Sequence, residues 1–234
     1  MKILAGEPTG KHGKKAMSLD VGCMIPCNPS SMPGPRHRKF IPNGLALDNG
    51  AFSCHVNGRA FDGDLFKRAV ANIGDMELLF VVCPDKVMGG IDSLEFSEMW
   101  RPMVEYQRIA LAVQDGMHGD DIEPIIDNYQ YLFVGGSVSW KWMYAEYWVK
   151  WGHARGIPVH IGQTGQLGML MAAQKIGADS VDSTSWCQNG TWWIVEAFRR
   201  NQIMELGLPR DALLEPPKSK RTIDNRWISR KLKH

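Results

Sequence analysis

The chain has 234 residues, of which 44% are hydrophobic and 22% charged, so it can bury a full core and its composition excludes a disordered protein. Its 27 basic residues nearly balance 25 acidic ones, which excludes a histone-like polycation and confines any nucleic-acid surface to a local patch. No apolar run approaches the roughly 20 residues of a membrane span. The N-terminus carries no apolar signal core and the five cysteines are scattered, so we expect a cytoplasmic protein that does not enter a membrane.

Short apolar segments that end in small, polar or acidic residues predict six strands. In chain order they are LALDNGAF (45–52), LLFVVCPD (78–85), IALAVQDG (109–116), YLFVGGS (131–137), IPVHIGQT (157–164) and SVDSTSW (180–186). Amphipathic patterns between them predict helices near 65–73, 96–104 with Ser93 as N-cap, 122–129, 140–156 and 164–176. This alternation indicates a parallel sheet, either open and doubly wound or closed into a barrel.

Polar or glycine residues stand at the carboxyl end of each predicted strand, where α/β proteins bind ligands. They are Asp48, Asp85, Gln114 with Asp115, Gly135 with Gly136, Gln163 with Thr164, and Asp182. Any single Asp there is more often a helix cap, but three carboxylates together favour a displacement at a sugar carbon. A dinucleotide fingerprint and a phosphate-binding loop are both missing from the sequence.

Two other features have a functional and a structural interpretation. The spacing of Cys23 and Cys27 matches no known zinc motif, so buried cysteine is favoured and we expect no metal. A basic tail over 216–234 follows a predicted single domain over 1–215, and it fits contact with a nucleic-acid backbone as well as a solvated terminus. The basic residues proposed to contact nucleic acid are Lys218, Lys220, Arg221, Arg226, Arg230 and Lys231.

Taken in order, the strand-end motifs resemble those of the tRNA-guanine transglycosylases. LALDNGAF resembles their D-S-G-G-[FY]-Q segment, LAVQDG their I-V-Q-G-G, and FVGGSV their G-G-L/F-A-V/S loop. FVVCPD is similar to their F-D-E strand end, and the run from VHIGQTG to DSTSW is similar to their long M-G-V-G…F-D-C-V segment. The resemblance covers roughly residues 45 to 187.

The resemblance implies a (β/α)₈ TIM-type barrel that exchanges guanine in a polynucleotide for a 7-deazaguanine through a covalent aspartyl–sugar intermediate, without a cofactor. It assigns Asp182 as nucleophile and Asp48 as general acid/base, with Asp85 and Gln114 reading the base edge. Gly135 and Gly136 would contact the base through their backbone, and Phe52 and Ile161 would sandwich its ring.

The chain also departs from the tRNA enzymes. Because Cys187 is its last cysteine, it lacks the C-x-C-x-x-C zinc subdomain that follows their nucleophile strand. The compact, zinc-less form is most similar to the phage-type 7-deazaguanine DNA transglycosylases, which would act in the host cytoplasm. We therefore expect DNA and a free 7-deazaguanine base, such as 7-cyano-7-deazaguanine, as partners, with tRNA as the alternative and a homodimer as an option.

Two other classes of function stay open. A nucleoside deoxyribosyltransferase or N-glycosidase would use a similar Asp nucleophile without needing a basic surface. A barrel that only binds nucleic acid or a modified base would need no nucleophile. Deleting the tail separates the first from a DNA enzyme, and substituting Asp182 separates the second.

Overall fold

The structure is a computed structural model that describes residues 1–205. Residues 1–199 form one compact unit. The predicted domain limit at residue 215 and the basic tail, with its proposed nucleic-acid contacts, lie outside the described residues and stay predictions.

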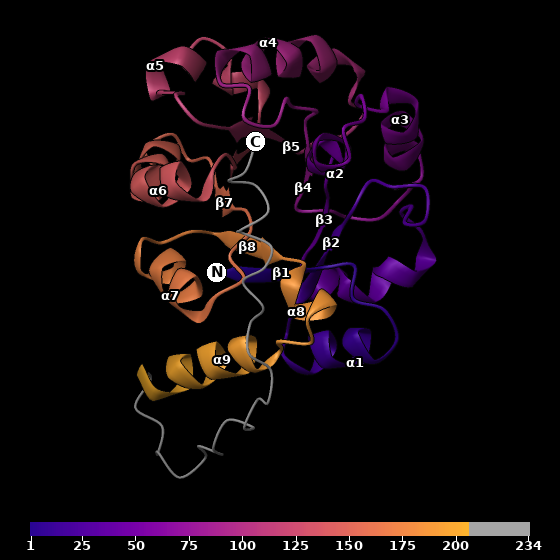
Figure 1. The fold of residues 1–234 in the computed structure, drawn as a ribbon, viewed down its shortest axis with the longest axis vertical. Helices are drawn as coiled ribbons and strands as arrows, with labels where there is room; N and C mark the ends of the chain where they lie inside the picture. The colour runs from indigo at the N-terminus through magenta and orange to yellow at the C-terminus, as the bar shows by residue number, and fades with distance from the viewer. Residues whose placement is uncertain (206–234) are drawn as a thin grey trace, which may run out of the picture. The chain divides into compact units, whose positions relative to one another are not determined.

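Eight parallel strands close into a barrel in chain order, with β8 pairing back onto β1 (Figure 1). This confirms the predicted compact (β/α)₈ TIM-type barrel. The strands are β1 (Lys2–Gly6), β2 (Gly22–Ile25), β3 (Leu45–Leu47), β4 (Phe80–Val82), β5 (Ile109–Val113), β6 (Tyr131–Val134), β7 (Val159–Ile161) and β8 (Ser180–Ser183).

Helices surround the strands and supply most of the connections between them (Figure 1). Among the described helices, none has the length and apolar character needed to cross a membrane. The α-helices are α1 (Gly10–Ser18), α2 (Ala51–Val56), α3 (Gly63–Ala71), α4 (Ile91–Trp100), α5 (Gly119–Ile122), α6 (Val138–His153), α7 (Leu167–Lys175), α8 (Ser185–Gln188) and α9 (Trp193–Glu205). The 3₁₀ helices are η1 (Pro35–Asn43), η2 (Arg101–Met103) and η3 (Ile126–Asn128).

The six strands predicted from the sequence are β3 to β8, and the structure adds β1 and β2. The connection after β2 is the proline-containing 3₁₀ helix η1, so the strand–helix alternation is hidden there. The helix predicted near 96–104 spans Ile91–Trp100 instead, because Pro102 interrupts it. Ser93 lies inside that helix and is not its N-cap, since its hydroxyl points inward and accepts a hydrogen bond from the Lys86 N–H.

Side chains alternate between the barrel interior and the layer under the helices, as a period of two requires. Ile3, Ile25, Val181 and similar residues pack in the outer layer, against the helices. The inner layer is small and is built by Leu4, Met24, Ala46, Phe80, Val82, Ala110, Ala112 and Tyr131. On β8 this alternation turns Val181 outward, so Asp182 faces the interior at the carboxyl end of the strand.

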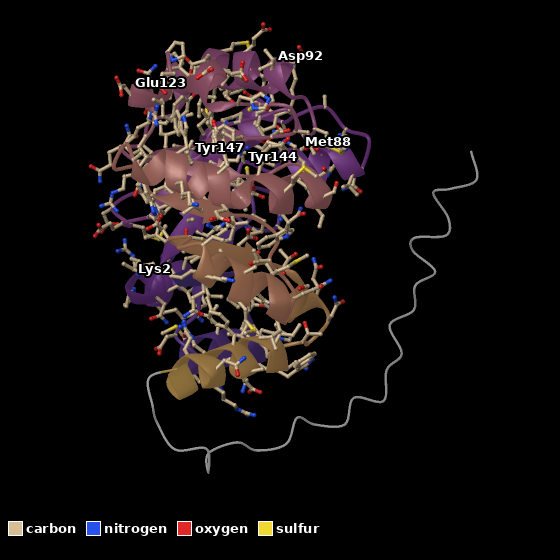
Figure 2. All side chains as sticks on the ribbon, turned by 90° about the vertical axis from the view of Figure 1, so that its left-hand side faces the viewer. Lys2, Met88, Asp92, Glu123, Tyr144 and Tyr147 are labelled. Carbon is tan, nitrogen blue, oxygen red and sulfur yellow. The ribbon has the colours of Figure 1, made fainter. Side chains whose placement is uncertain are left out.

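The two ends of the barrel differ in what they carry. Figure 2 shows the barrel from the side, with Lys2 at the start of β1 and Met88, beyond the end of β4, toward opposite ends. The strand-end polar residues belong to the Met88 end, which is where (β/α)₈ proteins carry their functional sites.

Candidate functional site

A cavity of about 330 Å³ lies at the carboxyl end of the barrel, within the size range of small-molecule sites. Six of the residues predicted from strand ends line it together: Asp48, Asp85, Gly135, Gly136, Gln163 and Asp182. They follow or end β3, β4, β6, β7 and β8. Parallel strands in a closed barrel bring such residues to one place although they are far apart in the sequence.

Asp182 is held rigidly by one of its two carboxylate oxygens. Oδ1 accepts a hydrogen bond from the Gln163 N–H at 3.1 Å and lies 3.1 Å from Nε2 of His160. Because a carboxylate accepts, we assign the His160 proton to Nε2, which leaves Nδ1 to accept from the Ser180 hydroxyl at 2.9 Å. Oδ2 makes no hydrogen bond to any residue in the described part of the chain, so it is the oxygen available to a ligand.

His160, which holds Oδ1 of Asp182, is fully buried. Its ring stacks on Phe133, with centroids 4.8 Å apart, and meets the edge of Phe80 at 5.1 Å. Gln163, whose N–H holds Asp182, has a left-handed φ of 59°, which is uncommon for a residue with a side chain. Packing and backbone therefore fix the Asp182 carboxylate before any ligand arrives.

Asp48 has an unusual acidity for a carboxyl group. Burial, followed by the negative charges of Asp182 and Asp85, raises its pKa from 3.8 to about 7. A group with that pKa can give and take a proton near neutral pH, as general acid–base catalysis requires.

Asp85 is oriented by a small network of side-chain amides. Asn49 donates to its Oδ1 at 2.7 Å and Gln114 donates to its Oδ2. Burial raises the pKa of Asp85 to about 6, and the hydrogen bond from Asn49 opposes that rise. With that pKa, Asp85 can accept hydrogen bonds as a carboxylate at neutral pH.

Gln114, predicted to read the base edge, does not line the cavity. It is 1% exposed, and besides Asp85 its amide donates to Ser93 Oγ at 3.0 Å and accepts from the Gly89 N–H at 3.3 Å. All of its polar atoms are thus engaged by the protein. In this structure Gln114 acts on the cavity through Asp85.

The glycine pair after β6 contains one position that only glycine can occupy. Gly136 has a φ of 74°, and a Cβ there would overlap Oδ2 of Asp115. That carboxylate accepts hydrogen bonds from the Ser137 N–H at 2.7 Å and the Ser137 hydroxyl at 2.5 Å, which holds the loop against β5. Gly135 is less demanding, since a Cβ there would make ordinary contacts.

The two residues predicted to sandwich a ring lie in different places. Phe52 lines the cavity mouth and is 51% exposed, as are the neighbouring rim residues Met88 at 60% and Val138 at 51%. Ile161 is fully buried in the layer facing the helices, because it alternates along β7 with the inward His160. The inward ring on this side of the cavity is Phe133.

Lys141 is a cavity residue that sequence reasoning missed. It lies on the first turns of α6, is 1% exposed and donates from Nζ to the Gly162 carbonyl at 2.7 Å. Burial lowers its pKa to about 8, against the opposing charges of Asp182 and Asp115. In the sequence Lys141 stands out only as a lysine within an aromatic-rich predicted helix. A lysine in such a helix usually faces solvent.

No metal site is present among residues 1–205: no group of three or more His, Cys, Asp or Glu is placed to hold an ion. All five cysteines are free thiols, and Cys23 and Cys27 are buried, in agreement with their interpretation as small apolar residues. The sequence also has a short basic run at residues 36–39. Within it, Arg36 pairs with Glu7 and Arg38 pairs with Asp75.

Neither a family model nor a curated protein matches this chain. The transglycosylase resemblance therefore stays a prediction.

Proposed function

We propose that the protein is a base-exchange transglycosylase that replaces guanine in DNA with a 7-deazaguanine through a covalent aspartyl–sugar intermediate. The observation that supports this best is the meeting of Asp48, Asp85 and Asp182 in one cavity, with different environments. Carboxyl groups held in different environments can divide the work of nucleophile, proton carrier and base reader.

Asp182 suits the nucleophile. Its Oδ2 would attack C1′ of the target nucleotide while the bond from C1′ to the guanine nitrogen breaks, which gives a glycosyl ester. The hydrogen bonds that hold Oδ1 leave one oxygen aimed and unencumbered. Attack by the incoming base on C1′ then releases the carboxylate unchanged, so the exchange needs no redox or metal chemistry.

Asp48 suits the proton carrier. In its protonated form it would give a proton to the departing guanine, and it would take back the proton that the incoming base loses on bond formation. A pKa of about 7 makes both forms available at neutral pH. Microscopic reversibility of the exchange requires both roles of one group.

Asp85 suits the recognition of guanine. Its two oxygens are held by side-chain amides and face a cavity in which N–H groups of a base would need acceptors. A guanine edge has adjacent N–H donors that a carboxylate can accept together.

The exposed rim favours a polynucleotide over a free nucleoside as substrate. Phe52, Met88 and Val138 surround the mouth with apolar surface that a nucleoside inside the cavity would leave uncovered. Bases adjacent to a flipped nucleotide can stack on such side chains.

The test is incorporation of labelled guanine by the purified full chain into duplex DNA and, in parallel, into bulk tRNA. Asp182→Asn keeps the shape of the side chain but removes its nucleophilic charge, and it should abolish incorporation. Asp64→Asn, an exposed aspartate in the first turn of α3, is the matched control.

The outcomes separate the alternatives. Label in DNA that disappears only with Asp182→Asn supports the proposal. Label only in tRNA would keep the chemistry and replace the substrate, and release of base from free nucleosides would favour the nucleoside enzyme. Equal incorporation by Asp182→Asn and the parent would refute the assigned nucleophile.

A further inference from the structure

The turn after β4 combines two features that are unfavourable in a folded protein. Met88 is 60% exposed, and its φ of 56° lies in the left-handed region, where a residue with a side chain is strained. A hydrogen bond from the Gly89 N–H to the Lys86 carbonyl at 2.9 Å closes the turn and leaves Met88 at its third position. A left-handed φ at that position usually calls for Gly or Asn, so folding stability does not explain the methionine.

The turn is held firmly although its tip is exposed. The Gly89 N–H also reaches the side-chain oxygen of Gln114 at 3.3 Å, and the amide nitrogen of the same Gln114 side chain donates to Asp85. One buried amide therefore fixes both the proposed base reader and the turn that follows it. Met88 keeps a set position at the mouth of the cavity, three residues beyond Asp85. Strain that the surroundings maintain in this way is typical of functional sites.

The turn also presents a positive charge. Lys86 is exposed, and its ammonium lies over the ring of Phe96, 5.8 Å from the centroid. It forms no ion pair with any residue in the described part of the chain. An ammonium group two residues from an exposed apolar side chain matches a nucleic-acid strand, in which a phosphate and a base face are close neighbours.

A stacked nucleotide in a DNA duplex cannot reach the proposed nucleophile. Asp182 is only 9% exposed and lies inside the cavity at the end of β8. The target nucleotide must therefore leave the stack, and the gap that it leaves is unfavourable until another group fills it. Apolar side chains, methionine among them, enter DNA between bases. Methionine is unbranched and polarizable, which suits contact with the faces of aromatic rings.

We propose that Met88 inserts into the duplex at the position that the target nucleotide vacates, while Lys86 contacts the adjacent phosphate. This inference rests on the proposed function, because it concerns how the same cavity obtains its nucleotide from paired DNA. Met88 is then a positioning residue, which favours the flipped nucleotide without touching a reacting atom. Its contribution depends on whether the target guanine is paired, and a purely structural role would not show that dependence.

The experiment compares the rates of labelled-guanine incorporation into a paired duplex and into its separated strands. Met88→Asn removes the apolar side chain and suits the left-handed backbone. It should lower the rate on paired DNA at least about tenfold, and the rate on single strands by less than about threefold. Met88→Leu, which stays apolar, should keep most of the rate on paired DNA. Met99→Asn changes a methionine of α4 that is 56% exposed and lies outside the cavity lining, and it should leave both rates unchanged.

Three results would overturn the inference. The first is an equal loss on both substrates, which would mean that Met88 only supports the site. The second is no loss on paired DNA. The third is a parent protein that exchanges guanine only in single strands, where no duplex gap forms. If Met88→Asn fails to fold by circular dichroism, Met88→Gly makes the same test with the residue best suited to this backbone.

A binding measurement separates this inference from the proposed function. If the parent protein exchanges guanine in neither form of DNA, the proposed function fails. Fluorescence anisotropy then compares a paired duplex with the same duplex lacking one base, in which the gap already exists. The parent should bind the duplex with the missing base at least about threefold more tightly, and Met88→Asn should remove this preference. Equal affinity of the parent protein for the two duplexes would overturn the inference.

Discussion

Asp48→Asn should stabilise the folded protein at alkaline pH. The folded-state pKa of Asp48 is about 7 against an ordinary value of 3.8, so the folded state holds a proton that the unfolded state loses between these values. For a carboxyl group with a raised pKa, the stability contributed is complete below about pH 4 and is lost as pH rises through about 7. A shift of about three units corresponds to about 4 kcal/mol.

The asparagine variant keeps the shape of the side chain and does not titrate. The free energy of unfolding of Asp48→Asn minus that of the parent should therefore rise by up to about 4 kcal/mol between pH 4 and pH 8. Urea unfolding followed by tryptophan fluorescence at intervals of half a pH unit measures this difference. Asp64→Asn gives the baseline for changing an exposed carboxyl group.

A difference that stays flat across this range, or that matches the Asp64→Asn baseline, would refute the burial and charge repulsion assigned to Asp48. A difference that falls with pH would mean that the folded protein stabilises the ionised form instead. Neither result depends on base exchange, so this prediction stands apart from the proposed function.

Gly136→Ala should lower the free energy of unfolding by at least about 1–2 kcal/mol, because its φ is left-handed and a Cβ would overlap the neighbouring carboxylate; chemical denaturation measures the loss. Asn49→Leu should raise the pKa of Asp85 above about 6 by removing a hydrogen bond to the carboxylate, and ¹³C NMR titration of the carboxyl carbon would show the opposite or no shift if that bond were unimportant. His160→Leu should reduce the kcat of base exchange at least about tenfold with a smaller change in KM, because the Asp182 carboxylate loses a hydrogen bond that orients it. A rise in KM as large as the fall in kcat would instead indicate a binding defect.

Much of the candidate site could be predicted from the sequence because parallel strands bring their carboxyl ends to one edge. Asp48, Asp85 and Asp182 each end an apolar segment, so their convergence follows from the strand–helix alternation alone. The burial of Cys23 and Cys27 was also predicted, because their spacing matches no zinc motif and unpaired cysteine usually packs as a small apolar residue. Local pattern and chain order were sufficient for both conclusions.

Tertiary structure decided which of these residues reach the cavity and in what state. Closure of the barrel sets the direction of each strand residue, and on β7 it turns His160 inward and Ile161 toward the helices. It also places Gln114 behind Asp85. Because β7 is only three residues long, its sequence alone does not show which of its two alternating faces points into the barrel.

The electrostatic character of the site has the same origin. Asp48 acquires its pKa of about 7 only when burial and two carboxylates from other strands surround it. Lys141 reaches the cavity only because the first turns of α6 pack over the ends of β6 and β7. The sequence determined which groups stand at the ends of the strands, whereas their directions, neighbours and protonation depend on contacts between segments far apart in the chain.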